Sequence, residues 1–376
     1  EHRITVIDKQ DVHVFSPSLL WVMVGSRQPA QVTKDLRRML QPGVELLAST
    51  VHEIDPDRQR VRVSNGELAY DYLVVALGAD LAPQAMSGFS EAAHTPFDLE
   101  GAVGTWSALG SFNRGRVAVL VSATPYKCPA APYEAALLLD DHFRRGGIRD
   151  RIEMQVYTPE VAPMGVAGPA MGRAVVAMLE ARGITFNPQL NPAGIDPAKK
   201  EIRFDNREPA TFDLLVGVPP HRPPRAVRES PLANQAGWVS VDRRTLKTGH
   251  DNVYAIGDVA AITLVNGKPL PKAGVFANGE AETVARRIAD EVRGTAAQAE
   301  FDGAGYCWIE MGGGLAGFAN GAFETARAWL GHRTGGVPMA SVVGCAIFGA
   351  ASGSGLRSAS RFSTNTSGCL STRSSA

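Results

Sequence analysis

Cys128 and its neighbour Lys127 stand in a turn between a predicted strand and a predicted helix. The stretch Arg116–Ser122 is apolar, which is typical of a buried parallel strand, and residues 133–143 have the composition of a helix. In that setting a turn usually carries glycines that wrap a phosphate group. Here residues 123–132 contain no glycine, and their prolines fix φ and remove N–H donors. The turn therefore indicates sulfur chemistry in place of nucleotide binding.

A thiol at the start of a helix has two reasons to be reactive. The positive end of the helix and the ammonium group of Lys127 both stabilise a thiolate, so we expect a lowered pKa for Cys128. Glu134 lies one turn into the same helix and is a candidate proton acceptor, although a helix-capping or surface role is equally open. A buried, inert thiol is the alternative for Cys128, because free cysteines are commonly buried.

Two predicted strands end in an acid, which suits a nucleotide cofactor. Ile4–Ile7 leads to Asp8, at the position where a dinucleotide-binding unit holds a ribose hydroxyl. The preceding strand and glycine loop would come before residue 1, so we interpret the N-terminus as truncated. Val253–Ile256 leads to Gly257 and Asp258, and such a glycine permits close approach to a ligand. An ordinary strand end and an exposed turn are the alternatives.

A long amphipathic helix is predicted from Val275 to Val292. Apolar residues recur along it at helical spacing, at Ala281, Val284, Ile288 and Val292. Its positive end would stabilise an anionic ligand, and Lys272 would add a full charge there. A solvated surface lysine is the alternative.

The predicted elements repeat one theme, a hairpin followed by a buried strand, at residues 56–79 and again at 202–217. This duplication predicts an α/β fold with two Rossmann-like dinucleotide-binding domains, the second inserted in the first, and an irregular C-terminal tail. We then expect Ile4–Ile7 and Val253–Ile256 to share one sheet. The predicted domains are a first dinucleotide-binding domain in two parts, 1–105 and 240–300, a second domain at 106–239 with Cys128, a region at 301–324 with Cys307, and a tail at 325–376.

Composition excludes several classes of protein. Lys plus Arg and Asp plus Glu number 38 each, and a balanced charge argues against nucleic-acid binding. The four cysteines are widely and irregularly spaced, as in neither a disulfide framework nor a zinc site, so we expect no metal.

The tail departs from the rest of the chain, because no acidic residue follows Glu324. Its glycines and serines make it a poor membrane segment, so we expect disorder or a reading-frame error. Cys345 and Cys369 are then incidental.

Three segments, Asp71–Gly78, Val253–Asp258 and Pro271–Ala281, resemble motifs of flavoproteins with two dinucleotide-binding domains. Together with residues 126–134, they resemble the sulfide:quinone oxidoreductase and flavocytochrome c sulfide dehydrogenase branch. The resemblance covers roughly residues 1–320. It implies that FAD binds at Asp8, Ala76, Gly78, Gly257, Asp258, Lys272, Ala273 and Gly274, with Asp258 on the ribityl chain.

The resemblance also implies a redox pair. Cys307 lies in a strand-like segment, residues 305–310, where family members carry a late redox-active cysteine. Cys128 and Cys307 would form a disulfide or polysulfide bridge beside the flavin, with Lys127 and Glu134 completing the catalytic set. Sulfide would attack one sulfur, and the released thiolate would reduce the flavin. A buried strand cysteine is the alternative for Cys307.

The electron acceptor stays open at this point. Many sulfide:quinone oxidoreductases have a third cysteine between the pair, and this chain has none between Cys128 and Cys307, as in the flavocytochrome c type. The acceptor implied is therefore a quinone or a cytochrome haem. The resemblance further implies peripheral association with a membrane surface, on its cytoplasmic or periplasmic face, and leaves a homo-oligomer open.

Two other functions compete with sulfide oxidation. A type II NADH:quinone dehydrogenase shares the flavin motifs, but it needs a glycine loop after Ser122. A truncated fragment unable to bind FAD is the other alternative.

Overall fold

The computed structural model describes residues 2–322 and 327–330. The expectations for Cys345, Cys369 and most of the 325–376 tail fall on residues outside the described ones. Of the tail, the strand β23 (Arg327–Leu330) is described, and strand differs from the expected disorder. Within the described residues, no helix has the length and apolar character needed to cross a membrane.

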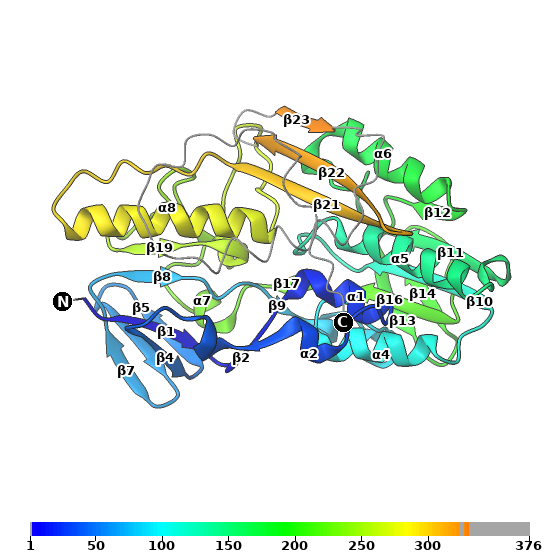
Figure 1. The fold of residues 1–376 in the computed structure, drawn as a ribbon, viewed down its shortest axis with the longest axis horizontal. Coiled ribbons are helices and arrows are strands. Elements are labelled where there is room, and N and C mark those ends of the chain that lie inside the picture. Colours follow the sequence, from blue (N-terminus) through cyan, green and yellow to red (C-terminus); the bar gives the residue numbers. More distant parts are fainter. Residues whose placement is uncertain (1, 323–326, 331–376) are drawn as a thin grey trace, which may run out of the picture. The chain divides into compact units, whose positions relative to one another are not determined.

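A parallel four-stranded sheet carries the turn at residues 123–132 that contains Cys128, which we call the cysteine turn. Its strands are β10 (Gly115–Val121), β11 (Ile152–Tyr157), β12 (Ile184–Asn187) and β16 (Leu214–Val218), in the order β12-β11-β10-β16. All five residues of β16 are buried, as expected for a parallel strand covered on both faces. The helices α5 (Ala131–Arg145) and α6 (Pro169–Glu180) pack beside this sheet (Figure 1). The predicted strand at 116–122 and helix at 133–143 are confirmed.

The hairpin-then-strand duplication is also present. In one copy, β5 (Val51–Asp55), β6 (Arg60–Val63) and β7 (Gly66–Ala69) precede β8 (Leu73–Val75). In the other, β13 (Pro192–Asp196), β14 (Glu201–Phe204) and β15 (Ala210–Thr211) precede β16. Both hairpin sheets are antiparallel three-stranded sheets.

Two further parallel pairs correct one expectation. β1 (Ile4–Asp8) pairs with β4 (Val44–Ala48), and β8 pairs with β19 (Val253–Ala255), in two separate sheets. The expectation that the first and last of these strands share one sheet is wrong, because no described strand bridges the two hydrogen-bond ladders. The β8–β19 ladder nevertheless joins residues 73–75 to 253–255, which were assigned to one domain. The domain boundaries themselves stay a prediction.

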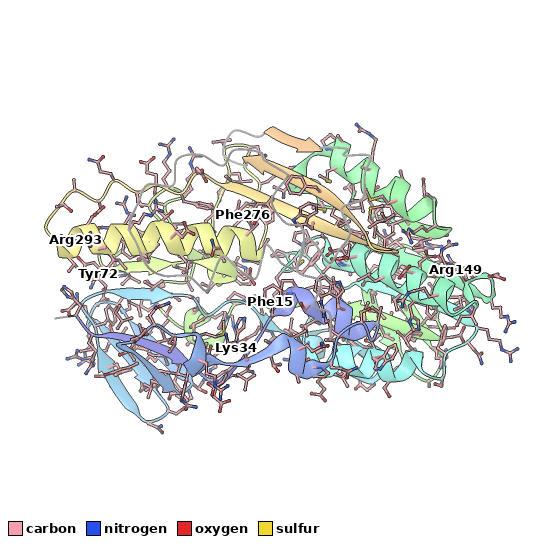
Figure 2. The ribbon with its side chains drawn as sticks, viewed as in Figure 1. Phe15, Lys34, Tyr72, Arg149, Phe276 and Arg293 are labelled. Carbon is pink, nitrogen blue, oxygen red and sulfur yellow. The ribbon has the colours of Figure 1, made fainter. Side chains whose placement is uncertain are left out.

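The helix α8 (Gly274–Val292) and the strand β21 (Ala304–Gly312) bring the C-terminal residues to the cysteine turn. β21 contacts α8 and also α5, and it pairs with β22 (Leu315–Ala322), which pairs with β23. Figure 1 shows β21 passing from α8 to α5. Phe276 lies in the first turn of α8, between the helix and β21 (Figure 2). The helix predicted for 275–292 is confirmed.

Shorter elements complete the described fold. They are β2 (Val12–Val14), α1 (Leu19–Met23), α2 (Pro29–Val32), β3 (Thr33–Asp35), β9 (Asp80–Leu81), α3 (Phe89–Ala92), α4 (Leu99–Leu109), β17 (His221–Arg222), α7 (Arg225–Arg228), β18 (Val239–Ser240) and β20 (Ala260–Ala261). One large apolar core surrounds α5, and both Cys128 and Cys307 pack against it.

Candidate active site

The cysteine turn is fastened to the segment before α8. Cys128 has a left-handed backbone, with φ of 55°, which residues other than glycine adopt uncommonly. Its N–H donates a hydrogen bond of 2.7 Å to the carbonyl oxygen of Lys272, and its own carbonyl accepts one of 2.9 Å from Ala131. A backbone hydrogen bond therefore joins the cysteine turn to the segment around Lys272, which was predicted to bind the cofactor.

Cys307 approaches the same place from β21. It lies opposite Ala319 in the β21–β22 ladder, and its thiol donates a weak hydrogen bond of 3.4 Å to the carbonyl oxygen of Trp308. Both cysteines are free and half-buried. The two side chains are close enough that Cys307 contributes to the pKa of Cys128. The structure thus brings the two predicted sulfur residues together.

Glu134 lies on α5, just after the turn that carries Cys128, and its side chain reaches β21, which carries Cys307. Its side chain is buried, with 4% of the residue exposed, and Oε1 accepts a hydrogen bond of 2.9 Å from the amide of Glu310 on β21. Burial raises the pKa of Glu134 to about 8, although the Glu310 amide acts in the opposite direction. A surface role is therefore wrong for this residue. A capping role is wrong too, since the carboxylate bonds to β21 and not to α5.

The expected lowering of the Cys128 pKa is wrong. Burial raises the pKa of this thiol well above its ordinary value, and the charge of Glu134 raises it further. An amide hydrogen bond from Ala131, at the helix start, acts to lower it and is outweighed. Lys127 is engaged elsewhere, because its Nζ donates to the carbonyl oxygen of Ala79 at 3.3 Å.

Cys307 behaves in the same way. Burial, with a further contribution from Glu134, raises the pKa of its thiol to about 12. Both thiols therefore rest protonated, and a thiolate forms only if a neighbouring group takes the proton. Glu134 is the carboxylate that acts on both.

A second cluster of charges lies on the other side of the Cys128–Lys272 hydrogen bond. The ammonium group of Lys272 donates to the carbonyl oxygens of Asp258 and Ala260 and stands 3.7 Å from the centroid of the Trp238 ring. Burial lowers the pKa of Lys272 to about 8. Burial also raises the pKa of Asp258, while Lys127 and Lys272 act to lower it. No described residue donates a hydrogen bond to the Asp258 carboxylate.

Two residues of this cluster escaped the sequence analysis. Glu280 is 2% exposed, and its Oε2 accepts a hydrogen bond of 2.5 Å from Gly257, whose φ is 70°. Burial raises the pKa of Glu280 to about 7. Trp238 was missed because no local motif surrounds it. Glu280 lies in the segment Pro271–Ala281, on the predicted helix that follows Lys272. This proximity to Lys272 in the sequence was the available signal.

The other predicted cofactor residues lie at open positions. Asp8 ends β1, and its exposed carboxylate accepts a hydrogen bond of 2.9 Å from the amide of Gln10. Gly78 has a φ of 69°, and a Cβ added there would meet nothing within 4 Å. Gly274 likewise opens on free space, and Ala273 precedes it as an N-cap without a side-chain hydrogen bond. Ala76 is exposed.

These residues fit FAD. A half-buried carboxylate without a described donor, at Asp258, suits a ribityl hydroxyl. The N-terminus of α8 has no side-chain cap, so its amides are available to an anionic group. Gly78 and Gly274 leave the backbone accessible to a close ligand.

Comparison with known proteins finds similar chains among sulfide:quinone oxidoreductases. No family model matches the chain. Over 269 residues it is 27% identical to the mitochondrial sulfide:quinone oxidoreductase of Mus musculus, a match that covers 68% of this chain and 59% of the mouse protein. The chain thus matches less than two thirds of that relative's length.

Two solved structures share the fold. The structure of the sulfide:quinone oxidoreductase from Aquifex aeolicus superposes with a TM-score of 0.77 at 24% identity, covering 85% of this chain and 78% of that one. The structure of NDH2 from Plasmodium falciparum in complex with NADH superposes with a TM-score of 0.71 at 13% identity, covering 93% and 90%. The predicted α/β fold with two dinucleotide-binding domains is confirmed.

Proposed function

We propose, from the premise that this chain is a sulfide:quinone oxidoreductase-like member of the flavoproteins with two dinucleotide-binding domains, that it oxidises sulfide at Cys128 and Cys307. The observation that carries the proposal is the meeting of both thiols with Glu134 against one core, although the two cysteines lie on different domains of the predicted organisation. A quinone is the proposed electron acceptor.

Cys128, Cys307 and Glu134 would have distinct roles in the oxidation of sulfide. In the oxidised enzyme a disulfide joins Cys128 to Cys307. Hydrosulfide attacks one sulfur, the disulfide bond breaks, a persulfide forms on the attacked cysteine, and the other cysteine leaves as a thiolate. When that thiolate and the persulfide join in a trisulfide, one proton and two electrons are released. Glu134 is placed to take the proton, because its pKa of about 8 lies near neutrality.

FAD, when bound, would accept the two electrons and pass them to the quinone. Asp258, Gly257, Gly78 and the α8 start near Lys272 would hold it, with Asp8 toward the ribose. Lys272, half-buried beside Trp238, would keep a positive charge near that helix start. Association with a membrane surface, where quinones reside, belongs to this proposal.

The direct test is anaerobic titration of the flavin-loaded protein with sulfide, followed by a quinone, with the flavin absorbance as the readout. Cys128→Ser and Cys307→Ser should each abolish reduction by sulfide while keeping the flavin. Cys345→Ser is the matched control and should reduce like the parent. A Cys128 or Cys307 variant that reduces at the parental rate would remove the pair from the mechanism.

Oxidation of NADH is the second candidate, because NDH2 shares the fold. The glycine-free turn argues against it, since Pro125, Pro129 and Pro132 lack the N–H groups that a pyrophosphate requires. Titration of the same protein with NADH separates the two. If NADH reduces the flavin faster than sulfide does, the dehydrogenase function replaces the one proposed. A protein purified without flavin absorbance would instead favour a non-catalytic chain.

A further inference from the structure

One carboxylate beside the cysteine turn receives three hydroxyl groups. Glu160 follows β11, at the carboxyl edge of the parallel sheet. Its Oε2 accepts hydrogen bonds from the hydroxyls of Tyr126 at 2.8 Å, Tyr133 at 2.5 Å and Thr158 at 3.1 Å. Both tyrosines are buried, and Tyr133 is fully so. Hydrogen bonds to a carboxylate are stronger than those between neutral groups, so Glu160 holds the three hydroxyl groups strongly.

The two tyrosines flank Cys128 in the chain. Tyr126 lies two residues before it in the turn, and Tyr133 lies five residues after it in the first turn of α5. The Tyr126 hydroxyl is also 3.3 Å from the carbonyl oxygen of Pro129. A single side chain, that of Glu160, therefore ties down both ends of the segment that presents the thiol.

That segment needs to be held. Cys128 keeps a left-handed backbone, which costs free energy for a residue with a side chain and persists only where surrounding contacts impose it. The hydrogen bond from its amide to Lys272 fastens one side of the turn. The Glu160 cluster fastens the other side, against β11.

Glu160 lies at a position where nucleotide-binding domains carry an acid with a different role. There, an acid after the second strand of the βαβ unit accepts hydrogen bonds from ribose hydroxyls. β10 and β11 are the first two parallel strands of this unit, and the chain's own tyrosines fill the acceptor that a ribose would need. Burial raises the pKa of both tyrosines well above the ordinary value, so the hydroxyls remain donors across the working pH range.

The geometry points to Glu160 as a positioning residue that, through Tyr126 and Tyr133, fixes the sulfur of Cys128 opposite Cys307. This inference rests on the proposed function, because it concerns how the same cysteine pair is aligned. Glu160 would touch neither sulfide nor flavin. Its effect would be on where the thiol stands and how readily other reagents reach it.

The test compares Glu160→Gln, Tyr126→Phe and Tyr133→Phe with the control Tyr157→Phe. Tyr157 ends the same strand and is equally buried, but its hydroxyl donates to Gln155 at 2.9 Å. Alkylation by iodoacetamide is followed over a range of pH, with peptide-level mass spectrometry reporting Cys128 and Cys307 separately. Flavin reduction by sulfide is measured on the same preparations.

Loss of a bond to a charged acceptor should free the turn. In the three variants Cys128 should be alkylated about tenfold faster and sulfide should reduce the flavin about tenfold more slowly, while Cys307 alkylation stays within about twofold of the parent. Tyr157→Phe should match the parent in both assays. If Cys128 alkylation in all three variants stays within about twofold of the parent, the inference is overturned.

The two proposals fail separately. A parent protein that sulfide does not reduce would end the proposed function, while the alkylation ratio would still decide whether Glu160 positions Cys128. If Glu160→Gln does not fold, the single-hydroxyl variants Tyr126→Phe and Tyr133→Phe decide the question.

Discussion

The amide of Cys128 is hydrogen-bonded to the carbonyl oxygen of Lys272, at 2.7 Å. This bond joins the turn of the second α/β unit to the segment that begins α8, and the residues on either side of it have different chemistry. On one side lie the two thiols and Glu134. On the other lie Asp258, Lys272 and Glu280. Because the link is between backbone atoms, it does not depend on which side chains the two residues carry.

The protonation of Glu134 should set the pH dependence of sulfide oxidation. Its pKa is about 8, so the carboxylate that can take the proton released on trisulfide formation forms only as the pH rises through that value. After correction for the ionisation of sulfide itself, the rate of flavin reduction should rise with a midpoint near pH 8 in the parent. Glu134→Gln should lose that midpoint and keep the slow rate of low pH. Stopped-flow absorbance measures both.

Glu280→Gln is the matched control for that experiment. Glu280 is also a buried glutamate with a raised pKa, near 7, but it bonds to Gly257 and does not act on either thiol. This variant should keep the midpoint near pH 8. A parental pH profile in Glu134→Gln would show that another group takes the proton.

Asp258 should decide whether flavin stays bound. Replacing it with Ala removes a half-buried acceptor that no described residue satisfies, and the affinity for FAD should fall by at least about tenfold. Equilibrium dialysis with free FAD measures the affinity without any assay of turnover. Asp242→Ala is the control, because that carboxylate bonds to the nearby Arg244 and Thr245 amides. Full flavin occupancy in the Asp258 variant would take this residue out of the cofactor site.

Asp140 should contribute to stability and not to chemistry. It is fully buried in α5 and accepts hydrogen bonds from Arg144, Arg149 and Arg182, with Arg149 lying just beyond the helix (Figure 2). Asp140→Asn should lower the free energy of unfolding by about 3 kcal/mol, because the partly buried guanidinium groups of Arg149 and Arg182 lose their buried counter-charge. Urea denaturation at neutral pH measures the loss, and an unchanged midpoint would contradict it.

The sign of the pH effect at Asp140 follows from its pKa. Burial acts to raise that pKa, but the hydrogen bonds from the arginines outweigh it and the net shift is downward. The folded protein therefore binds fewer protons than the unfolded chain around the ordinary value of 3.8. The stability that Asp140 contributes is present above that value and is lost as the pH falls, so parent and Asp140→Asn should converge in acid.

A larger residue at Gly305 should destabilise the protein. A Cβ added there would come within 2.3 Å of the Phe276 ring, at the contact between β21 and α8. Gly305→Ala should lower the free energy of unfolding by roughly 2 kcal/mol, because the ring or the strand must move. Gly249→Ala is the control, since nothing lies within 4 Å of a Cβ at that position. Thermal unfolding of both variants tests this, and equal melting temperatures would contradict it.

Local patterns were enough for the secondary structure that carries the site. The apolar run at 116–122 and the helical spacing at 275–292 predicted β10 and α8, because burial periodicity is a property of neighbouring residues. The glycine-free turn before α5 was equally visible in the chain. The pairing of β1 was predicted wrongly, since which strands hydrogen-bond depends on residues far apart in sequence.

The sequence by itself determined which residues have sulfur and carboxylate chemistry: Cys128, Cys307, Glu134 and Asp258. Only the tertiary structure decided their ionisation. A sequence shows a lysine next to a cysteine, and so predicts a lowered pKa for Cys128, but it does not show how much water the thiol has lost. Burial of both thiols beside Glu134 reversed the direction of the shift, because desolvation outweighs a helix terminus and a lysine that is hydrogen-bonded elsewhere.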